Sequence, residues 1–224
     1  MKLRCPIQKN YLFNGKTCIL NQLFGENPDS GFNGPAGHTG LDIYTLGDLK
    51  YIRDNKGWLK TERNDYEKEG RIPLMASHAG KTTLQLNPDK QKEGWGLFVT
   101  ADPIYEAGIE VQYRTIYWHI ETPFESIGAF WGAIKRTLSP TVVSGQIIAV
   151  AGNNGYTGGP HLHFELQKRI NRGDWFSIDP MPYFTDIEVL FQKPGMSVHR
   201  WFYQGREITR ERVEEIKKTL LPVI

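Results

Sequence analysis

The segment Gly158-Gly159-Pro160-His161-Leu162-His163-Phe164-Glu165-Leu166 is the strongest structural signal in this chain. Polar and apolar residues alternate along it, which is typical of a β-strand, because successive side chains of a strand point to opposite faces. One face would carry His161, His163, Glu165 and Gln167, and the other would carry Leu162, Phe164 and Leu166. We therefore predict a strand that packs one face on a core and presents two imidazoles to a groove.

Two further histidines lie in similar strand-like or turn-like contexts. His38 is followed four residues later by the carboxylate of Asp42, and His119 ends an alternating stretch at Ile116–Ile120. Neutral imidazole and carboxylate are natural ligands of zinc, and a catalytic zinc usually takes three protein ligands and leaves one position for water. The residue types and their spacing therefore indicate a metal site.

Taken in order, these motifs resemble those of the lysostaphin/LytM-type zinc endopeptidases. The pair His38 and Asp42, the strand that ends at His119, and the Gly-Pro-His-Leu-His motif follow one another as they do in that family. Four lesser landmarks also fall in family order, at Asn21–Gly25, Ile72–Lys81, Ser144–Gly152 and Asp179–Phe184. The resemblance extends over residues 16–184.

The resemblance implies a mainly β fold, an antiparallel sheet with an active-site groove of the duplicated-hybrid-motif type. It also implies that His38, Asp42 and His163 hold one Zn²⁺ per chain, with His119 and His161 beside the water that attacks the substrate. We expect His161 to act as the main base and His119 to stabilise the tetrahedral state, as histidine side chains can. The residues alone do not decide whether His161 or His163 is the ligand, because both share one strand face.

The implied activity is zinc-dependent endopeptidase hydrolysis of bacterial peptidoglycan, with the cross-link peptide as the partner. Two alternatives stay open. One is a non-catalytic structural or activator module of the same fold, for example in a virion, and the other is an enzyme that cuts another glycine-rich peptide. The five filled positions favour catalysis, because non-catalytic relatives typically lose ligands. The scissile bond stays open among Gly-Gly, D-Ala–Gly and D-Ala–diaminopimelate.

One departure from the family pattern concerns the oxyanion. Some members place a tyrosine a few residues before the first ligand, and Phe32 stands there in this chain. Phenylalanine has no hydroxyl donor. Either another group, such as Tyr44 or Tyr117, stabilises the oxyanion, or that stabilisation is weaker.

Length and charge fit a single enzyme domain with appendages. The chain has 224 residues, 23% of them charged, and a net charge of +2. There is no concentrated basic patch, so a nucleic-acid partner is not expected. Cys5 and Cys18 are equally compatible with a disulfide and with two buried thiols.

The sequence shows no stretch near the roughly 20 apolar residues of a membrane span, and residues 1–10 lack the apolar region of a secretory signal. The resemblance implies a protein, with a monomer favoured, that acts on the bacterial cell wall. Delivery as a phage lysin or in a virion, or removal of a leader, would bring it there.

The remaining pattern predicts an N-terminal segment at 1–15, the zinc endopeptidase domain at 16–184 and a C-terminal extension at 185–224. Segments at about 46–71, rich in charge, and about 121–141 look inserted. Short strands are expected at 11–14, 17–23, 41–45, 72–76, 80–86, 96–101, 109–120, 146–151 and 161–168.

Details of these elements can also be predicted. The strand at 109–120 would turn Tyr113, Thr115, Tyr117 and His119 to the polar groove face and Ile116, Trp118 and Ile120 to the core. In the extension, 186–192 would add a strand. Residues 209–221 would form an amphipathic helix, capped by Thr209, whose apolar stripe docks on the domain. His78 is expected at the groove rim or surface, and Glu165 either orients a ligand or joins a surface salt bridge.

Overall fold

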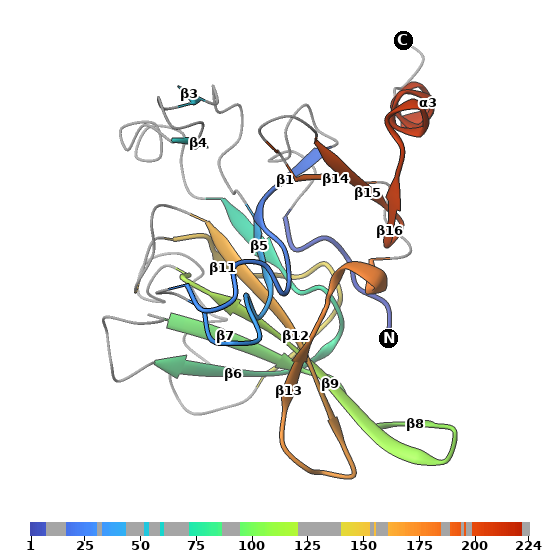
Figure 1. Cartoon of the computed structure of the whole chain (residues 1–224). Helices are drawn as coiled ribbons and strands as arrows, with labels where there is room; N and C mark the ends of the chain where they lie inside the picture. The colour runs from blue at the N-terminus through green and yellow to red at the C-terminus, as the bar shows by residue number, and fades with distance from the viewer. Residues whose placement is uncertain are drawn as a thin grey trace.

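The computed structural model describes residues 1–7, 17–30, 33–43, 52–53, 59–60, 72–86, 95–120, 140–152, 155, 161–184, 189–193, 195 and 199–220. Strands dominate these residues, and the helices among them are the 3₁₀ helix η2 (Met181–Tyr183) and the α-helix α3 (Arg210–Leu220) (Figure 1). The expected mainly β fold with a short C-terminal helix is confirmed. None of the helices in the described ranges has the length and hydrophobicity needed to cross a membrane.

A twelve-stranded sheet contains most of the structure, in the order β10-β6-β7-β9-β12-β2-β1-β14-β15-β16, with β8 added to β9 and β13 added to β12. Its strands are β1 (Thr17–Gln22), β2 (Leu41–Ile43), β6 (Gly80–Leu86), β7 (Trp95–Thr100), β8 (Ile104–Glu106), β9 (Ile109–Trp118), β10 (Thr141–Val142), β12 (Leu162–Ile170), β13 (Phe176–Ile178), β14 (Leu190–Lys193), β15 (Arg200–Tyr203) and β16 (Arg206–Ile208). These strands pair antiparallel except β1 and β14, which run parallel. Two further pairs lie apart from this sheet: β5 (Pro73–Met75) with β11 (Ile147–Val150), and β3 (Ile52–Arg53) with β4 (Leu59–Lys60).

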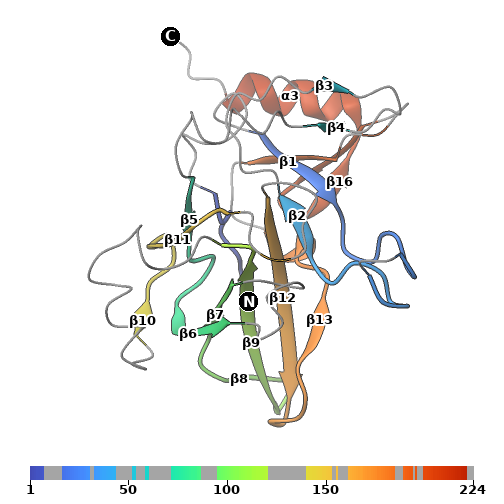
Figure 2. The same cartoon turned by 90° about the vertical axis from the view of Figure 1, so that its left-hand side faces the viewer.

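Strand β12 confirms the strand expected at 161–168, and it lies in the interior of the sheet. It pairs with β9 from His163 opposite Trp118 to Ile170 opposite Val111, and with β2 at its start. Figure 2 shows β9 and β12 side by side along their length. Leu162, Phe164 and Leu166 are fully buried in the main core. We call the opposite face, which carries His163, Glu165, Gln167 and Arg169, the site face.

The prediction for the two faces of β9 was wrong within the strand, although Ile120 lies in the main core as expected. Tyr113 and Tyr117 belong to the main core, whereas Ile116 and Trp118 form a second cluster with Phe98 on the site face. Polar groups of the tyrosine face find partners inside the protein: the Tyr117 hydroxyl accepts a 2.7 Å hydrogen bond from the Ser77 N–H. Because these hydroxyls are satisfied internally, the face can be buried despite its polar composition.

The first seven residues pack into the main core, where Leu3, Cys5 and Ile7 are buried. Because that core lies on the sheet face opposite His163, these residues are away from the site face. The thiols of Cys5 and Cys18 are both buried and free, so the disulfide is not formed. Burial, together with a contact from Cys5, raises the pKa of the Cys18 thiol well above its usual value.

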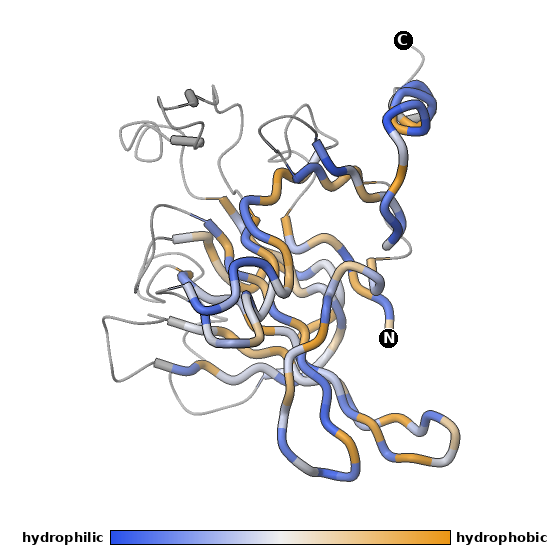
Figure 3. The backbone as a smooth tube through the Cα atoms, in the orientation of Figure 1, coloured by the Kyte–Doolittle hydropathy of each residue, from blue (hydrophilic) through white to orange (hydrophobic). Residues whose placement is uncertain are grey.

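The C-terminal extension continues the sheet through β14, which pairs with β1, and then folds back through β15 and β16 to α3. The side chain of Thr209 accepts a hydrogen bond from the Arg212 N–H at the start of the helix, as predicted. Val213 and Ile216 pack against Leu190. Figure 3 shows how α3 mixes hydrophilic and hydrophobic positions, in keeping with a helix that docks one side only.

Several expectations fall on residues outside the described part of the chain. These are the strand at 11–14, most of the two inserted segments, Phe32, Tyr44, and the side chain of Leu220. Within the first inserted segment the described residues are β3 and β4, which pair antiparallel. The predicted domain boundaries stay predictions.

Candidate metal centre

Asp42 and His163 meet because β2 and β12 pair in register. Asp42 stands directly opposite His163 in this antiparallel ladder, and directly opposite residues share a face of the sheet. Asp42 Oδ1 lies 3.1 Å from His163 Nδ1. The carboxylate and the imidazole are therefore held together by two paired strands.

His38 enters from the turn that leads into β2. Its N–H donates to the Glu26 carbonyl at 2.9 Å, and its carbonyl accepts from the Gly25 N–H at 2.8 Å. Gly40 then passes so close to β12 that a Cβ there would lie 2.3 Å from the Phe164 carbonyl oxygen. Only glycine permits this approach, which brings the chain from His38 to Asp42 alongside His163.

Three potential ligand atoms converge at this point. His38 Nε2 lies 2.9 Å from His163 Nδ1 and 3.1 Å from Asp42 Oδ1, and Asp42 Oδ1 lies 3.1 Å from His163 Nδ1. Ligand atoms at the corners of a zinc tetrahedron lie about 3.3 Å apart, given zinc–ligand bonds of about 2.0–2.2 Å. Two imidazoles and one carboxylate are also the donor types that zinc accepts. His38, Asp42 and His163 therefore fit a metal ion.

The electrostatics of the cluster favour a positive charge at its centre. Burial would lower the pKa of His163, but hydrogen bonds and charge from Asp42 and Glu165 outweigh it and raise that pKa to about 10. Burial would raise the pKa of Asp42, but hydrogen bonds from His161, His163 and His38 hold it well below its usual range. The negative charges of Asp42 and Glu165 that favour this proton would also favour a metal cation, whose binding would displace the proton from His163.

His119 and His161 lie beside this cluster. Their ring centroids are 4.8 Å apart, and the His119 ring is 6.0 Å from that of His163. His161, immediately before β12, brings its Nε2 to 3.4 Å from Asp42 Oδ1. Two imidazoles thus stand next to the convergence point of the candidate ligands.

His119 reaches the site by a local reversal of the backbone. Its φ of 60° lies in the left-handed region, which a residue with a Cβ rarely adopts. Alternation along β9 would otherwise turn His119 to the side of Tyr117, which is fully buried in the main core. Because β9 ends at Trp118 and the next residue takes this conformation, the imidazole points to the site face instead.

Glu165 anchors the far side of His163. Its Oε1 lies 3.1 Å from His163 Nε2, 3.1 Å from Thr39 Oγ1 and 3.1 Å from Trp118 Nε1. Its Oε2 accepts hydrogen bonds from Gln167 and Ser177 at 3.0 and 3.1 Å. Only 7% of Glu165 is exposed, so the surface salt bridge is excluded and the orienting arrangement is the one observed.

Burial would raise the pKa of Glu165, but the hydrogen bond and charge of His163, with the bonds from Gln167 and Ser177, hold it below its usual range. Glu165 is therefore an ionised acceptor on the Nε2 side of His163. Such an acceptor directs the other ring nitrogen, Nδ1, toward the candidate metal position.

The sequence did not identify Thr39, Ser177 or the role of Trp118 at this site. Thr39 and Ser177 are ordinary polar residues far apart in the chain, and nothing in their spacing signals a shared partner. The Trp118 ring lies over Gly96, where a Cβ would be 2.3 Å from the ring. The closeness of Gly96 and Trp118, two residues on neighbouring strands, is visible only in the register of β7 and β9.

The five residues named from the sequence thus lie together, although their division into ligands and catalytic groups stays a prediction. Tyr117 does not reach the site, because its hydroxyl is bound in the core. His78 is also buried, with Nε2 3.1 Å from Thr115 Oγ1, so its expected place at the rim or surface was wrong. His199 is exposed and accepts from the Gly195 N–H.

Comparison with known proteins finds similar solved structures, while no family model and no curated protein matches the chain. The catalytic domain of the antimicrobial peptidase lysostaphin from Staphylococcus simulans is 22% identical, with a TM-score of 0.42, over 74% of this chain and 90% of that one.

Two other structures are similar at the same level. A variant of the catalytic domain of the prophage-encoded M23 protein EnpA from Enterococcus faecalis is 19% identical, with a TM-score of 0.44, over 74% of this chain and 91% of that one. A zinc containing peptidase from Vibrio cholerae is 17% identical, with a TM-score of 0.41, over 79% of this chain and 39% of that one.

Proposed function

We propose that this chain is a zinc-dependent endopeptidase that hydrolyses peptide cross-links of bacterial peptidoglycan. The observation that supports the proposal best is the convergence of His38 Nε2, Asp42 Oδ1 and His163 Nδ1 within 2.9–3.1 Å, with the imidazoles of His119 and His161 alongside. Three protein ligands leave one tetrahedral position open, which is the arrangement of catalytic rather than structural zinc sites.

Zinc held there would polarise a scissile carbonyl and lower the pKa of a water molecule toward about 7. The chain's own residues would handle the protons. His161, with Nε2 close to Asp42, is placed to accept a proton from the attacking water as a general base. His119, whose ring adjoins that of His161, is placed to donate a hydrogen bond to the oxygen on which charge develops.

The backbone of His119 adds support for this role. Non-glycine residues in the left-handed region carry strain, and such residues cluster at functional sites where the surrounding structure holds them. At the end of β9 this conformation turns the imidazole toward the candidate metal centre, 6.0 Å from the His163 ring.

The substrate class rests on the resemblance of the sequence motifs to the lysostaphin/LytM-type family. Peptidoglycan as substrate places the site of action at the bacterial cell wall. A non-catalytic module of the same fold would keep the sheet but would not need the buried acceptor system of Glu165 around His163. This buried set of hydrogen bonds around Glu165 supports a catalytic function.

The proposal is tested by mass spectrometry of fragments released from purified peptidoglycans of several cross-link types, with and without a zinc chelator. We expect fragments that end at one type of peptide bond and that disappear when zinc is removed. If the zinc-loaded protein releases no fragments from any cross-link type, the structural-module alternative replaces the proposal.

A further inference from the structure

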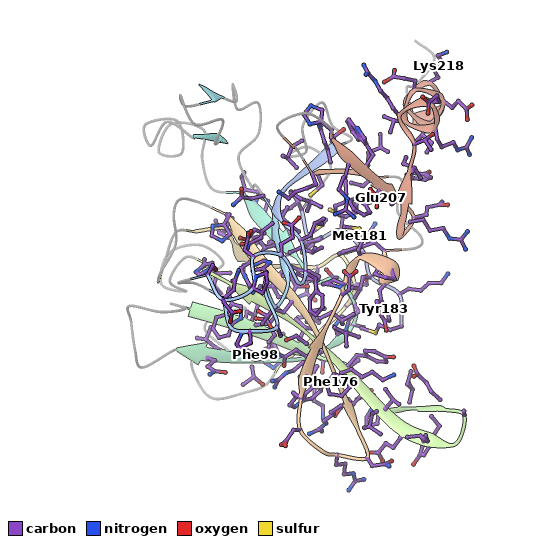
Figure 4. The ribbon with its side chains drawn as sticks, viewed as in Figure 1. Phe98, Phe176, Met181, Tyr183, Glu207 and Lys218 are labelled. Carbon is purple, nitrogen blue, oxygen red and sulfur yellow. The ribbon has the colours of Figure 1, made fainter. Side chains whose placement is uncertain are left out.

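A second group of functional side chains lies further along the site face, toward the end of β12. Arg114 on β9 stands opposite Gln167 on β12, and Arg169 stands opposite Gln112. Gln167 is four residues from His163, which is about 13 Å along a strand. Sheet order places β9 and β12 between β7, which carries Phe98, and β13, which begins at Phe176 (Figure 4).

Two guanidinium groups share one aromatic ring in this group. Trp175 lies 4.3 Å from the guanidinium carbon of Arg114 and 4.7 Å from that of Arg169, measured to the ring centroid. The guanidinium carbon of Arg114 also lies 4.9 Å from the centroid of the Phe98 ring. Stacking of this kind holds the planar guanidinium groups in fixed orientations, and the N–H groups that do not donate to Gln167 or Gln112 can bind a planar anion.

Hydrogen bonds to neutral side chains fix both arginines further. Arg114 Nε donates to Gln167 Oε1 at 2.8 Å, and Arg169 donates through Nε and Nη2 to Gln112 Oε1. Neither arginine forms an ion pair with a carboxylate in the ranges that the structure describes. Their neighbours on the same hairpins do: Lys168 pairs with Glu106, and Arg172 pairs with Glu110.

The two positive charges are therefore close together, partly buried and neutralised by no adjacent carboxylate among the described residues. Burial lowers the pKa of Arg114, the more distant charge of Glu165 opposes this effect, and the charge of Arg169 adds to it. An anion bound between the two guanidinium groups would relieve this repulsion and accept paired hydrogen bonds.

The group is also connected to the candidate metal centre. Arg114 donates to Gln167, Gln167 donates to Glu165 Oε2, and Glu165 Oε1 lies 3.1 Å from His163 Nε2. An anion held by Arg114 would thus sit on the same ordered surface as the peptide bond to be cut, roughly four extended residues from it.

We propose that Arg114 and Arg169, stacked on Trp175, form a subsite that binds a carboxylate of the cross-link peptide. This inference rests on the proposed function for the identity of the substrate. It adds a specificity requirement: the preferred cross-link carries a free carboxylate at a distance of several residues from the scissile bond.

The test compares two preparations of one peptidoglycan, both freed of phosphate-containing polymers. One keeps its free carboxyl groups, and the other has them converted to amides. Zinc-loaded wild type and the Arg114→Gln/Arg169→Gln double variant are assayed on both. Arg172→Gln is the matched control, because it removes the same charge from an exposed arginine outside the subsite.

We expect amidation to slow the wild type and Arg172→Gln by roughly tenfold to a hundredfold, as loss of a hydrogen-bonded charge pair should. The double variant should cleave both preparations at the same reduced rate. Arg114→Lys keeps the positive charge but loses the planar guanidinium group, so the slowing caused by amidation should be intermediate between the wild type and the double variant. The subsite is overturned if the wild type cleaves both preparations at the same rate. It is also overturned if amidation slows the wild type and the double variant by the same factor.

Co-sedimentation of chelator-treated protein with the same two preparations separates the subsite from the proposed activity. Stronger binding of the wild type to the carboxyl-bearing preparation, lost in the double variant, supports the subsite even if no protein cleaves. Binding that needs the phosphate-containing polymers instead assigns the arginines to a phosphate and overturns the carboxylate proposal.

Discussion

Asp42 on β2 and His163 on β12 face each other across an antiparallel ladder, with Oδ1 and Nδ1 3.1 Å apart. Both side chains therefore take their positions from paired strands rather than from loops. Sites built on strands hold ligands more precisely than sites on loops, because the ladder fixes the backbone on both sides. The position of His38 depends on the same pair of strands, because the close approach of Gly40 to β12 holds the turn that carries His38.

The first prediction concerns the charge of Asp42. Asp42→Asn keeps the shape of the side chain but removes the anionic ligand, so bound zinc should fall from one ion per chain to a small fraction after dialysis. Elemental analysis of the dialysed protein measures this. Glu207→Gln, at an exposed ion pair with Arg200, is the matched control and should retain zinc. A full zinc complement in Asp42→Asn would remove Asp42 from the ligand set.

The second prediction concerns Glu165. Glu165→Gln should weaken zinc binding by about 10- to 100-fold. The substitution replaces the buried carboxylate that orients His163 with a neutral amide, in which one of the two acceptor oxygens becomes an NH₂ donor. Competition with a chromophoric chelator measures the affinity. Ser177→Ala removes only a hydrogen bond to Glu165 Oε2 and should change the zinc affinity far less. Equal zinc affinities for wild type and Glu165→Gln would mean that Glu165 does not position the ligand.

The third prediction uses the left-handed backbone of His119. His119→Ala and His119→Gly should both lower turnover by about 10²- to 10⁴-fold while zinc content stays normal. The glycine variant should be more stable than the alanine variant by about 1 kcal/mol, because only alanine keeps the Cβ that strains φ at 60°. Urea unfolding of the two variants measures the difference. Undiminished turnover with normal zinc would exclude the catalytic role.

The fourth prediction concerns stability at low pH. Burial lowers the pKa of His78, and the hydrogen bond to the Ala79 carbonyl only partly opposes this. The unfolded chain therefore binds the proton more readily than the folded protein, so stability is complete above about pH 6.5 and falls as the pH drops below it. The loss attributable to His78 is at most about 1.4 kcal/mol per pH unit.

Urea unfolding of wild type and His78→Gln at about pH 7.5 and about pH 5 isolates this effect, since other groups titrate equally in both. The wild type should lose more stability than the variant between the two values. The same loss in both proteins would show that His78 is protonated as easily in the folded state as in the unfolded chain.

Much of the site was predictable because its chemistry is local in the sequence. The alternation at Leu162–Leu166 determines which side of β12 is buried, and His38 and Asp42 are separated by a single short turn. The order of these motifs also located the third strand with His119. Residue type and spacing indicate a metal site because metal ligands must be a few specific side chains, whereas the choice of ligands came from the resemblance to a known family.

The face of β9 was not predictable from polarity. The hydroxyls of Thr115 and Tyr117 meet His78 and the Ser77 N–H, which lie on a distant segment, and the Tyr113 hydroxyl donates to Glu106 on the neighbouring strand β8. Trp118 lies on the site face because Gly96 leaves room for its ring. The acceptor role of Glu165 likewise depends on Thr39 and Ser177, which only the folded sheet brings together.

The most direct test of the account is a zinc titration of metal-stripped protein, with the initial rate of peptide-bond cleavage in peptidoglycan as the readout. The account predicts no cleavage without zinc, a linear rise with added zinc and a plateau at one ion per chain, with Asp42→Asn inactive throughout. Cleavage by the stripped protein, or no cleavage with zinc bound at one ion per chain, would contradict it.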